Sequence, residues 1–502
     1  VVLDASGGDD QNGFVVTGPV RVDARDFENV VGTDFDDKVR GSKEDNILSG
    51  GDGADTLRGL RGDDTIVGNK GDDRMIGGAG DDLLVWNNGD GSDLMKGGRG
   101  DDRTQVNFDT DLVNDDLQND DTARIESAGQ NFRFARTEVN GQSERGLFEL
   151  DIRFVETLEV NFGGGDDTAE LVGVPSRRLT TELDGGEGED TLDLSDVERA
   201  AVVDIGAGLA SVERGGDVVF EGFENVIGTD FADEIVGDGG ANLIASGSAN
   251  DEIEGGDGDD TLLGNLGDDE VFGGEGDDLL IWNNGDGSDL LNGGEGDDRV
   301  QVNFQQNTDL SELDLQNDDV ATIADDGEGG ITFNRVEVNG QSERGLFQLD
   351  IEESETLEVN FGGGNDVAQV LGLADLNIAL QLDGGDGVDT IDFSGLDLDG
   401  EEEGVVFDAA SGEIETVAGD ASDDVAAGFE NIVGTAGDDV ISGDDQDNVI
   451  EGGGGSDILS GGAGADTFVF GDEPGVTVIL DFEVGQDRIA FRSESFGVEE
   501  PL

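Results

Sequence analysis

The apolar positions of the chain follow a nine-residue pattern, in which six glycine-rich and acidic residues precede three residues with an aliphatic side chain at their centre. The pattern repeats six times without interruption from Gly32 to Val85, and Gly50–Arg58, with the sequence GGDGADTLR, is one copy. Three residues are too few for a helix, and one apolar side chain at a fixed point predicts a short strand that faces a core. Because so short a unit cannot bury its apolar face alone, we expect the chain to stack coil upon coil, with two copies of the pattern in each coil.

The polar part of each copy predicts a calcium-binding turn. Glycines allow the left-handed backbone conformations of tight turns, and the sixth position carries a carboxylate, as at Asp55 and Asp64. The chain has no histidine and no cysteine, so the turns offer only carboxylate and main-chain carbonyl oxygens. Such hard oxygen ligands favour calcium and disfavour zinc and copper.

These residues match the nonapeptide GGxGxDxUx, so the chain resembles the RTX (repeats-in-toxin, hemolysin-type) calcium-binding family. The resemblance implies an all-β fold, a calcium-stabilised parallel β-roll or β-solenoid with ions between successive turns, bound by the sixth-position aspartates and neighbouring carbonyls. One ion for each copy would give up to about 20 calcium ions. The residues that match the ligand position are Asp37, Asp55, Asp64, Asp73, Asp82, Asp102, Asp190, Asp233, Asp251, Asp260, Asp269, Asp278, Asp298, Asp389, Asp439, Asp457 and Asp466. A neutral amide stands at this position in Asn46, Asn242 and Asn448, and we expect those sites to be weak or empty.

A longer repeat is superimposed on the short one. Residues 27–172 and 223–370 align almost throughout, and a related seven-residue segment begins at Phe27, Phe223 and Phe429. We therefore expect a first long repeat at 1–201, a second at 202–404, a partial third at 405–469 and a C-terminal region at 470–502. The nonapeptide arrays of the two complete repeats cover 32–105 and 228–301. Alternating apolar and polar residues at 106–182 and 302–381 predict β-hairpin excursions from the solenoid.

Three further segments carry their own predictions. Added residues at Trp86–Asp93 and Trp282–Asp289 predict a bulged coil closed by a tryptophan, for which we favour a core role over sugar stacking. The loop Glu138–Phe148 is identical to Glu337–Phe347, which reflects either a recent duplication or a shared contact surface. The segment Gly464–Phe491 resembles the C-terminal region of RTX proteins exported by the type I route, which implies an uncleaved export signal and a β cap on the roll.

Charge and composition exclude several classes of function. The 122 acidic and 26 basic residues give a formal net charge of −96, which requires counterions and argues against binding to nucleic acid or anionic lipid. No apolar stretch of about 18 residues could form a transmembrane segment. Without histidine or cysteine, Ser-His-Asp triads, HExxH zinc sites and thiol nucleophiles are absent, and the carboxylate pairs fall inside the calcium pattern. We therefore expect no enzymatic activity.

The sequence favours a secreted, extracellular structural protein, whose folding and self-assembly into a surface layer, filament or matrix depend on calcium. Two alternatives stay open. The chain could be the C-terminal part of a larger secreted enzyme whose catalytic domain precedes Val1, or an adhesin that contacts a cell surface or a glycan. The mass of the native protein would separate the first alternative from the others.

Overall fold

In the computed structural model the described residues form β-strands as their only regular structure, in two compact units, Val1–Ser248 (unit 1) and Ala249–Leu502 (unit 2). No helix long and apolar enough to cross a membrane occurs among the described residues. The residues that the structure describes are 2–3, 19, 21–23, 28–108, 120–128, 131–139, 148–173, 176–304, 318–326, 330–338, 346–372, 378–396, 403–416, 424–471 and 475–492.

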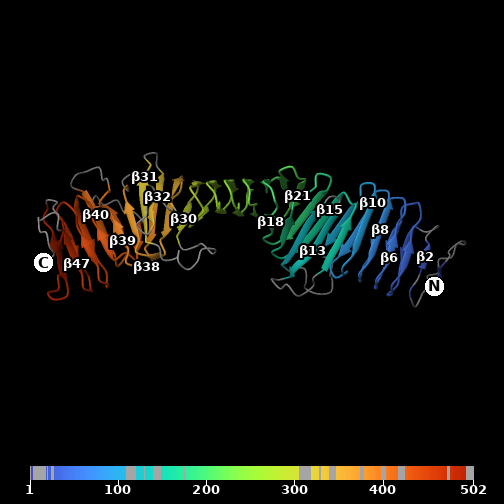
Figure 1. Cartoon of the computed structure of the whole chain (residues 1–502), viewed down its shortest axis with the longest axis horizontal. Coiled ribbons are helices and arrows are strands. Elements are labelled where there is room, and N and C mark those ends of the chain that lie inside the picture. The colour runs from blue at the N-terminus through green and yellow to red at the C-terminus, as the bar shows by residue number, and fades with distance from the viewer. Residues whose placement is uncertain are drawn as a thin grey trace. The chain divides into compact units, whose positions relative to one another are not determined.

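Unit 1 is a stack of short strands joined by tight turns (Figure 1). The strands are β1 Val2–Leu3, β2 Arg21–Asp23, β3 Asn29–Val31, β4 Lys38–Arg40, β5 Ile47–Ser49, β6 Thr56–Arg58, β7 Thr65–Val67, β8 Arg74–Ala79, β9 Leu83–Asn87, β10 Leu94–Arg99, β11 Arg103–Asn107, β12 Asp121–Ala128, β13 Asn131–Val139, β14 Phe148–Arg153, β15 Thr157–Gly164, β16 Thr168–Val172, β17 Thr180–Glu187, β18 Thr191–Asp196, β19 Ala201–Asp204, β20 Leu209–Val212, β21 Asp217–Glu221, β22 Asn225–Ile227, β23 Glu234–Val236 and β24 Leu243–Ala245.

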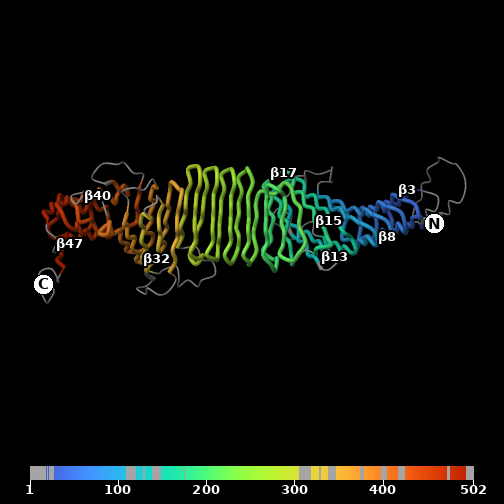
Figure 2. The backbone as a smooth tube through the Cα atoms, turned by 90° about the horizontal axis from the view of Figure 1, so that it is seen from above, coloured from blue at the N-terminus to red at the C-terminus, as the bar shows by residue number. Residues whose placement is uncertain are grey.

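From β3 to β11, successive strands of unit 1 alternate between two sheets, because each pairs in parallel with the strand two places along the chain. In the first sheet Val39 lies beside Leu57, and Leu57 lies beside Met75. In the second sheet Leu48 lies beside Ile66. All five side chains are buried, so the single aliphatic residue of each nonapeptide forms a continuous row in the core. Two nonapeptides therefore make one coil, and Figure 2 shows these coils as neighbouring turns of the backbone.

The hairpins expected after the first array are incorporated in the sheet and do not leave it. The first sheet runs β10–β14–β13–β12–β16, in which β13 is antiparallel to both of its neighbours while the outer pairings are parallel. Further along, the second sheet runs β17–β21–β20–β19–β23 with the same arrangement. Each insertion thus satisfies its backbone hydrogen bonds within the ladder, which is what a segment with alternating polar and apolar residues requires.

Unit 2 repeats this construction. Its strands are β25 Glu252–Asp257, β26 Thr261–Leu263, β27 Glu270–Glu275, β28 Leu279–Asn283, β29 Leu290–Glu295, β30 Arg299–Asn303, β31 Asp319–Asp325, β32 Ile331–Val338, β33 Phe347–Glu352, β34 Thr356–Asn360, β35 Gly363–Gly364, β36 Val367–Val370, β37 Ala379–Asp383, β38 Asp386–Gly387, β39 Thr390–Asp392, β40 Glu403–Asp408, β41 Ile414–Thr416, β42 Val425–Ala427, β43 Asn431–Val433, β44 Asp438–Ser442, β45 Val449–Glu451, β46 Ile458–Ser460, β47 Thr467–Phe470, β48 Val478–Ile479 and β49 Arg488–Phe491.

The ladders of unit 2 continue to its C-terminal strands. One sheet contains β29–β33–β32–β31–β36, with β32 antiparallel to its neighbours, and it then runs through β39, β43, β45 and β47 to β49. On the other face, β44–β46–β48 continue the parallel stack. The expectation of an all-β parallel roll with interposed hairpins and a C-terminal β segment is confirmed. The boundaries expected at 201 and 404 concern the sequence repeats and stay predictions.

Both tryptophans lie in the core. The Trp86 side chain is buried, its indole N–H donates to the carbonyl oxygen of Gly91 at 2.8 Å, and its ring lies 3.9 Å from that of Phe148. Trp282 makes the equivalent hydrogen bond to Gly287 and lies against Phe347. These side chains are not accessible for stacking on a sugar. Most of the two identical loops, and residues 493–502 of the C-terminal region, lie outside the described residues.

A buried ion pair anchors each antiparallel insertion next to its tryptophan. In unit 1 the guanidinium of Arg136 donates to the carboxylate of Asp121 at 2.8 Å and to Asn88 at 3.0 Å, and it lies over the ring of Phe108. Both charged side chains are 4% exposed. Arg335 and Asp319 form the same pair in unit 2. A buried ion pair adds little net stability over an apolar pair, but removal of one partner leaves an uncompensated charge.

We expect Arg136→Met to lower the free energy of unfolding by about 3–5 kcal/mol, because it removes the cation that neutralises the buried Asp121 carboxylate. The control is Arg133→Met on the same strand, whose partner Glu149 is exposed, and it should cost no more than about 1 kcal/mol. Urea unfolding at saturating calcium measures both values. Equal losses for the two variants would contradict the structural role of the buried pair.

Candidate calcium sites

Ladders of buried aspartates run along the turns of each unit, and alternate nonapeptides contribute to different ladders. The backbone N–H of Asp37 donates to Oδ1 of Asp55 at 2.6 Å, and the N–H of Asp55 donates to Oδ1 of Asp73 at 2.7 Å. In unit 2 the N–H of Asp251 donates to Oδ1 of Asp269 at 2.8 Å. Each carboxylate therefore uses one oxygen to hold the preceding coil of its own ladder. Every aspartate expected at the sixth position is buried.

The other carboxylate oxygen of most of these aspartates has no hydrogen-bond donor among the described residues. These buried Oδ2 atoms belong to Asp55, Asp64, Asp73, Asp82, Asp93, Asp102, Asp167, Asp190, Asp269, Asp278, Asp298, Asp366 and Asp389. A buried carboxylate oxygen without a donor or a cation is costly, and it is rare for so many to recur at one position of a repeat. The recurrence indicates that these oxygens are arranged to bind cations.

Main-chain carbonyls border the same spaces. A Cβ atom at Gly50 would collide with Oδ2 of Asp55 and with the carbonyl oxygen of Gly68, so these two oxygens lie beside the same gap between coils. Gly255 has the same surroundings, formed by Asp260 and Gly273. Glycine at the first position of the nonapeptide thus leaves room for an ion between a carboxylate and a carbonyl. Within the described residues no three acidic side chains converge, so carbonyls must complete the coordination of any bound ion.

Burial raises the pKa of these carboxyl groups. The pKa of Asp55 rises to about 6, that of Asp73 to about 7 and that of Asp93 to about 8, in each case mainly by desolvation. Hydrogen bonds from backbone N–H groups lower the pKa, while neighbouring aspartates raise it further. In the absence of metal the fold therefore favours the protonated form of its own ligands, and a cation would replace the proton.

Five of the expected ligand residues have surroundings that differ from this pattern. In three of them a threonine follows the first glycine, and the N–H and hydroxyl of that threonine donate to the carboxylate, as Thr33 does to Asp37 at 2.6 and 2.9 Å. Asp233 and Asp439 are held in the same way by Thr229 and Thr435. The hydroxyl of Thr477 donates to Oδ2 of Asp457 at 3.2 Å. Asp466 is less regular, because its N–H donates to Asp487 outside the array.

The asparagines at the sixth position are satisfied by the protein itself. Oδ1 of Asn46 accepts from the N–H of Ser42 at 2.7 Å, and its amide nitrogen donates to the carbonyl of Glu28 at 3.4 Å. Oδ1 of Asn242 accepts from the N–H of Asp238, and its amide nitrogen donates to the carbonyl of Glu224. Asn448 makes the equivalent bonds with Asp444 and Glu430. An amide can donate as well as accept, so these turns hold together without a cation.

Some ligand candidates were missed in the sequence because they lie where the nonapeptide is irregular. The additional residues after Trp86 lengthen the coil, and the N–H of Asp73 bonds to Asp93 at a separation of 20 residues, where regular coils have 18. Asp289 of unit 2 accepts from the N–H of Asp269 in the same way. Asp167 and Asp366 follow three consecutive glycines in a shortened copy. Aligning each aspartate by the apolar residue two places after it would have found these residues. Four ladders end at a glutamate, whose carboxylate accepts a hydrogen bond from the backbone N–H of the last aspartate. These glutamates are Glu156, Glu224, Glu355 and Glu430.

A family model for the RTX calcium-binding nonapeptide repeat matches six segments, residues 31–66, 49–84, 220–253, 246–280, 284–308 and 433–468. These segments contain regular parts of the aspartate ladders. They are RTX calcium-binding repeats. The resemblance seen in the sequence is confirmed, and calcium is the ion that such repeats bind.

Other comparisons add little to this identification. The crystal structure of the extracellular lipase LipA from Serratia marcescens is similar over 66% of this chain and 39% of the lipase chain, with 14% identity and a TM-score of 0.14. The RTX-repeat chain thus spans about two-fifths of the length of that lipase. A search of curated protein sequences gave no match.

We expect Asp64→Asn to raise the calcium dissociation constant of the affected turn about tenfold or more, because it removes a charged ligand but keeps the acceptor for the N–H of Asn46. Neighbouring turns should also weaken, since stacked repeats are coupled to their neighbours. Asn46→Ala is the control and should leave the number of bound ions unchanged. Calorimetric titration with calcium measures both effects, and equal losses would refute the assignment of the sixth position.

The metal-free protein should become less stable as the pH rises. The pKa values of Asp55, Asp73 and Asp93 in the fold, about 6 to 8, lie above the ordinary value of 3.8, so the folded state retains protons that the unfolded chain releases. This contribution is complete below about pH 4 and is lost as the pH rises through 6 to 8. Circular dichroism of the chelated protein should show the β-signal falling as the pH is raised from 4 to 8. A constant or rising signal would contradict it.

Proposed function

We propose that this chain is a secreted calcium-binding structural protein whose folding and self-assembly depend on calcium. The observation that carries the proposal is the row of buried Oδ2 atoms without a donor, which in the regular copies lie beside a glycine-lined gap between coils. Asp64 and Asp82 of the RTX array, for example, lie in successive coils of one ladder, joined by a hydrogen bond from the N–H of Asp64 to Oδ1 of Asp82 at 3.0 Å. Calcium supplies positive charge and accepts several oxygen ligands in irregular geometry.

Folding and calcium binding are coupled by charge and by entropy. The chain carries a net charge of −96, and 86 glycines raise the conformational entropy that folding must overcome. The core offers one aliphatic side chain for each nonapeptide, which is a small apolar burial for nine ordered residues. The binding free energy of the ions therefore supplies much of the folding free energy.

The proposed extracellular location follows from the calcium affinity of such sites. RTX-repeat proteins are typically secreted. Extracellular calcium modules bind with dissociation constants of about 10⁻⁴–10⁻³ M, so the chain would remain unfolded at the low calcium concentration inside a cell. It would fold after export. The type I export route remains part of this proposal.

The proposed self-assembly depends on the repeated surface of the two arrays. Two arrays with the same backbone present the same spacing of outward side chains along parallel ladders. Repeated surfaces allow many weak contacts to act together, and divalent ions reduce the repulsion between acidic molecules. The proposal assigns no catalytic role to the chain. The mass of the native protein tests the alternative, in which these repeats are the C-terminal part of a larger secreted enzyme.

Calcium should both fold the protein and bring molecules together. In chelated protein at neutral pH, we expect circular dichroism to show a disordered chain, and the β-signal to appear as calcium is raised through about 10⁻⁴–10⁻³ M. Light scattering should rise over the same range. Magnesium at equal concentration is the control and should be less effective, because it requires regular octahedral geometry and retains its waters. Full β-signal after exhaustive chelation would refute coupled folding, and a folded monomer at all concentrations would refute assembly.

A further inference from the structure

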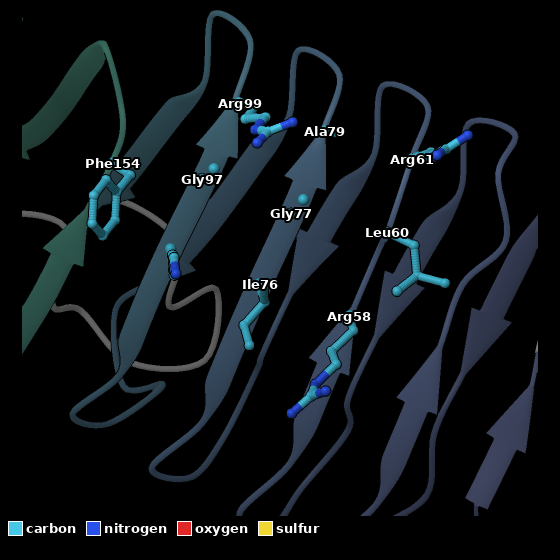
Figure 3. Close-up of a pocket in the computed structure, with 12 residues that line it drawn as sticks. Arg58, Leu60, Arg61, Ile76, Gly77, Ala79, Gly97, Arg99 and Phe154 are labelled. Atoms are coloured by element: carbon cyan, nitrogen blue, oxygen red, sulfur yellow. The ribbon is translucent and has the colours of Figure 1, made fainter.

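A groove of about 560 Å³ on the first sheet of unit 1 gathers positive charge. Figure 3 shows the arginines that line it together with Leu60, Ile76 and Phe154. The side chains that matter for its chemistry are Arg58, Leu60, Arg61, Lys96, Arg99 and Phe154, and we call this set the basic groove. The chain has 26 basic and 122 acidic residues, so a groove lined by four cationic side chains has a charge opposite in sign to that of the protein as a whole.

The cations of the basic groove face outward by the geometry of the strands. Arg58 and Lys96 flank the buried Leu57 and Met95 on β6 and β10, and Ile76 of β8 lies between them in the ladder. Alternation of side chains along a strand then places these residues on the outer face. Lys96 lies 4.9 Å from the centre of the Phe154 ring, whose side chain is 42% exposed.

The arginines of the basic groove are not neutralised within the described part of the chain. Arg58, Arg61 and Arg99 form no ion pair there. Other arginines of unit 1 do, since Arg103 bonds to Glu159 at 2.6 Å and Arg124 to Asp196 at 2.7 Å. Acidic side chains are abundant, so unpaired arginines grouped in one groove are available for an external anionic partner.

Unit 2 carries acidic or neutral residues at the equivalent positions of its own array. The long repeat, with its offset of 196 residues, replaces arginine or lysine by Glu254, Asp257, Glu270, Asn292 and Glu295. The ladder β25–β27–β29 brings Asp257 beside Glu275 and Glu275 beside Glu295, and these three side chains are exposed. We call the exposed residues Glu252, Glu254, Asp257, Glu270, Glu275 and Glu295 the acidic face.

We propose that the basic groove of one molecule docks against the acidic face of a second copy of this chain. The inference rests on the proposed self-association and specifies its surfaces. Both surfaces lie on parallel ladders with the same strand spacing of about 4.8 Å, so rows of opposite charge can match along several strands. Groove against groove, or face against face, would place like charges together and is disfavoured.

The proposed contact joins two different surfaces, so it does not close on itself. A contact of this kind leaves one free groove and one free face on every pair, and more molecules can add at both. Leu60, Ile76 and Phe154 provide apolar surface within the basic groove, and the half-buried Phe272 provides it on the acidic face. Charge then determines which surfaces meet, while apolar contact adds affinity.

Charge reversal tests the contact with variants that the fold already accommodates. The groove variant is Arg58→Glu with Arg99→Glu, and the face variant is Glu254→Arg with Glu295→Arg. Each substitution introduces an acid or a base at a position where the equivalent array already carries that sign. At saturating calcium, analytical ultracentrifugation should show that either variant alone associates at least about tenfold more weakly than the unchanged protein.

A mixture of the two variants provides the decisive result. The intact face of the groove variant can dock in the intact groove of the face variant, and the acidic groove of the first matches the basic face of the second, so equal amounts should recover association with the two variants alternating. A chain that carries all four substitutions should recover association, because its charges are exchanged. The control is Arg178→Glu with Arg214→Glu, two exposed arginines outside the groove that change the net charge by the same amount, and it should associate normally.

The outcomes separate this inference from the proposed function. Association of the groove and face variants equal to that of the unchanged protein would overturn the docking contact and leave calcium-dependent assembly intact. A strictly monomeric unchanged protein would overturn both. An acidic glycan is the other candidate occupant of the basic groove, and heparin serves as a probe for it. If the groove variant lost heparin binding and still associated normally, the groove would be a glycan site and the docking contact would be wrong.

Discussion

The regular coils of this protein depend on carboxylates that are stacked between backbone turns with one oxygen bonded and the other without a donor. The bonded oxygen, as in Asp55, fixes the register of neighbouring coils through a backbone N–H. The second oxygen has no donor and lies beside a main-chain carbonyl. Buried carboxylate and carbonyl oxygens without donors destabilise the fold by themselves. A cation in the gap between coils binds these oxygens and so holds the coils together. The short strands and the thin core follow from this constraint, because the turns carry the cohesion that a larger core provides in other folds.

The sequence was sufficient where the nonapeptide is regular and insufficient where its spacing changes. A fixed period of nine determined the strands, the buried aliphatic row and the sixth-position aspartates such as Asp64. Asp93, Asp289, Asp167 and Asp366 were missed because insertions and deletions shift them within the pattern, although hydrogen bonding places them in the aspartate ladders. The threonine bonds to Asp37 were also not foreseen, since they depend on a donor that the pattern treats as variable. The antiparallel insertions were expected outside the solenoid, because pairing between distant strands cannot be read from alternation alone.

The two arrays separate the requirements of the core from those of the surface. Leu57, Met75 and Met95 of unit 1 are matched in unit 2 by Ile253, Val271 and Leu291, and all are buried. The residues that flank them change from basic to acidic with no change in the strand pairing. Coil stacking constrains only the inward residue and the turn, so the outward positions can vary in charge without cost to the fold.

The antiparallel insertions also have a geometric consequence for the two sheets of unit 1. The insertion of β12 and β13 adds two strands to the first sheet at a level where the second sheet, β11 to β15, adds none. Two strand spacings make one face about 10 Å longer than the other, which on its own would force the stack to bend. Further along, β19 and β20 add two strands to the second sheet between β17 and β23, while β18 pairs directly with β22 in the first. The second insertion cancels the difference in length, so the insertions act as a compensating pair that lets the coils resume their level stacking.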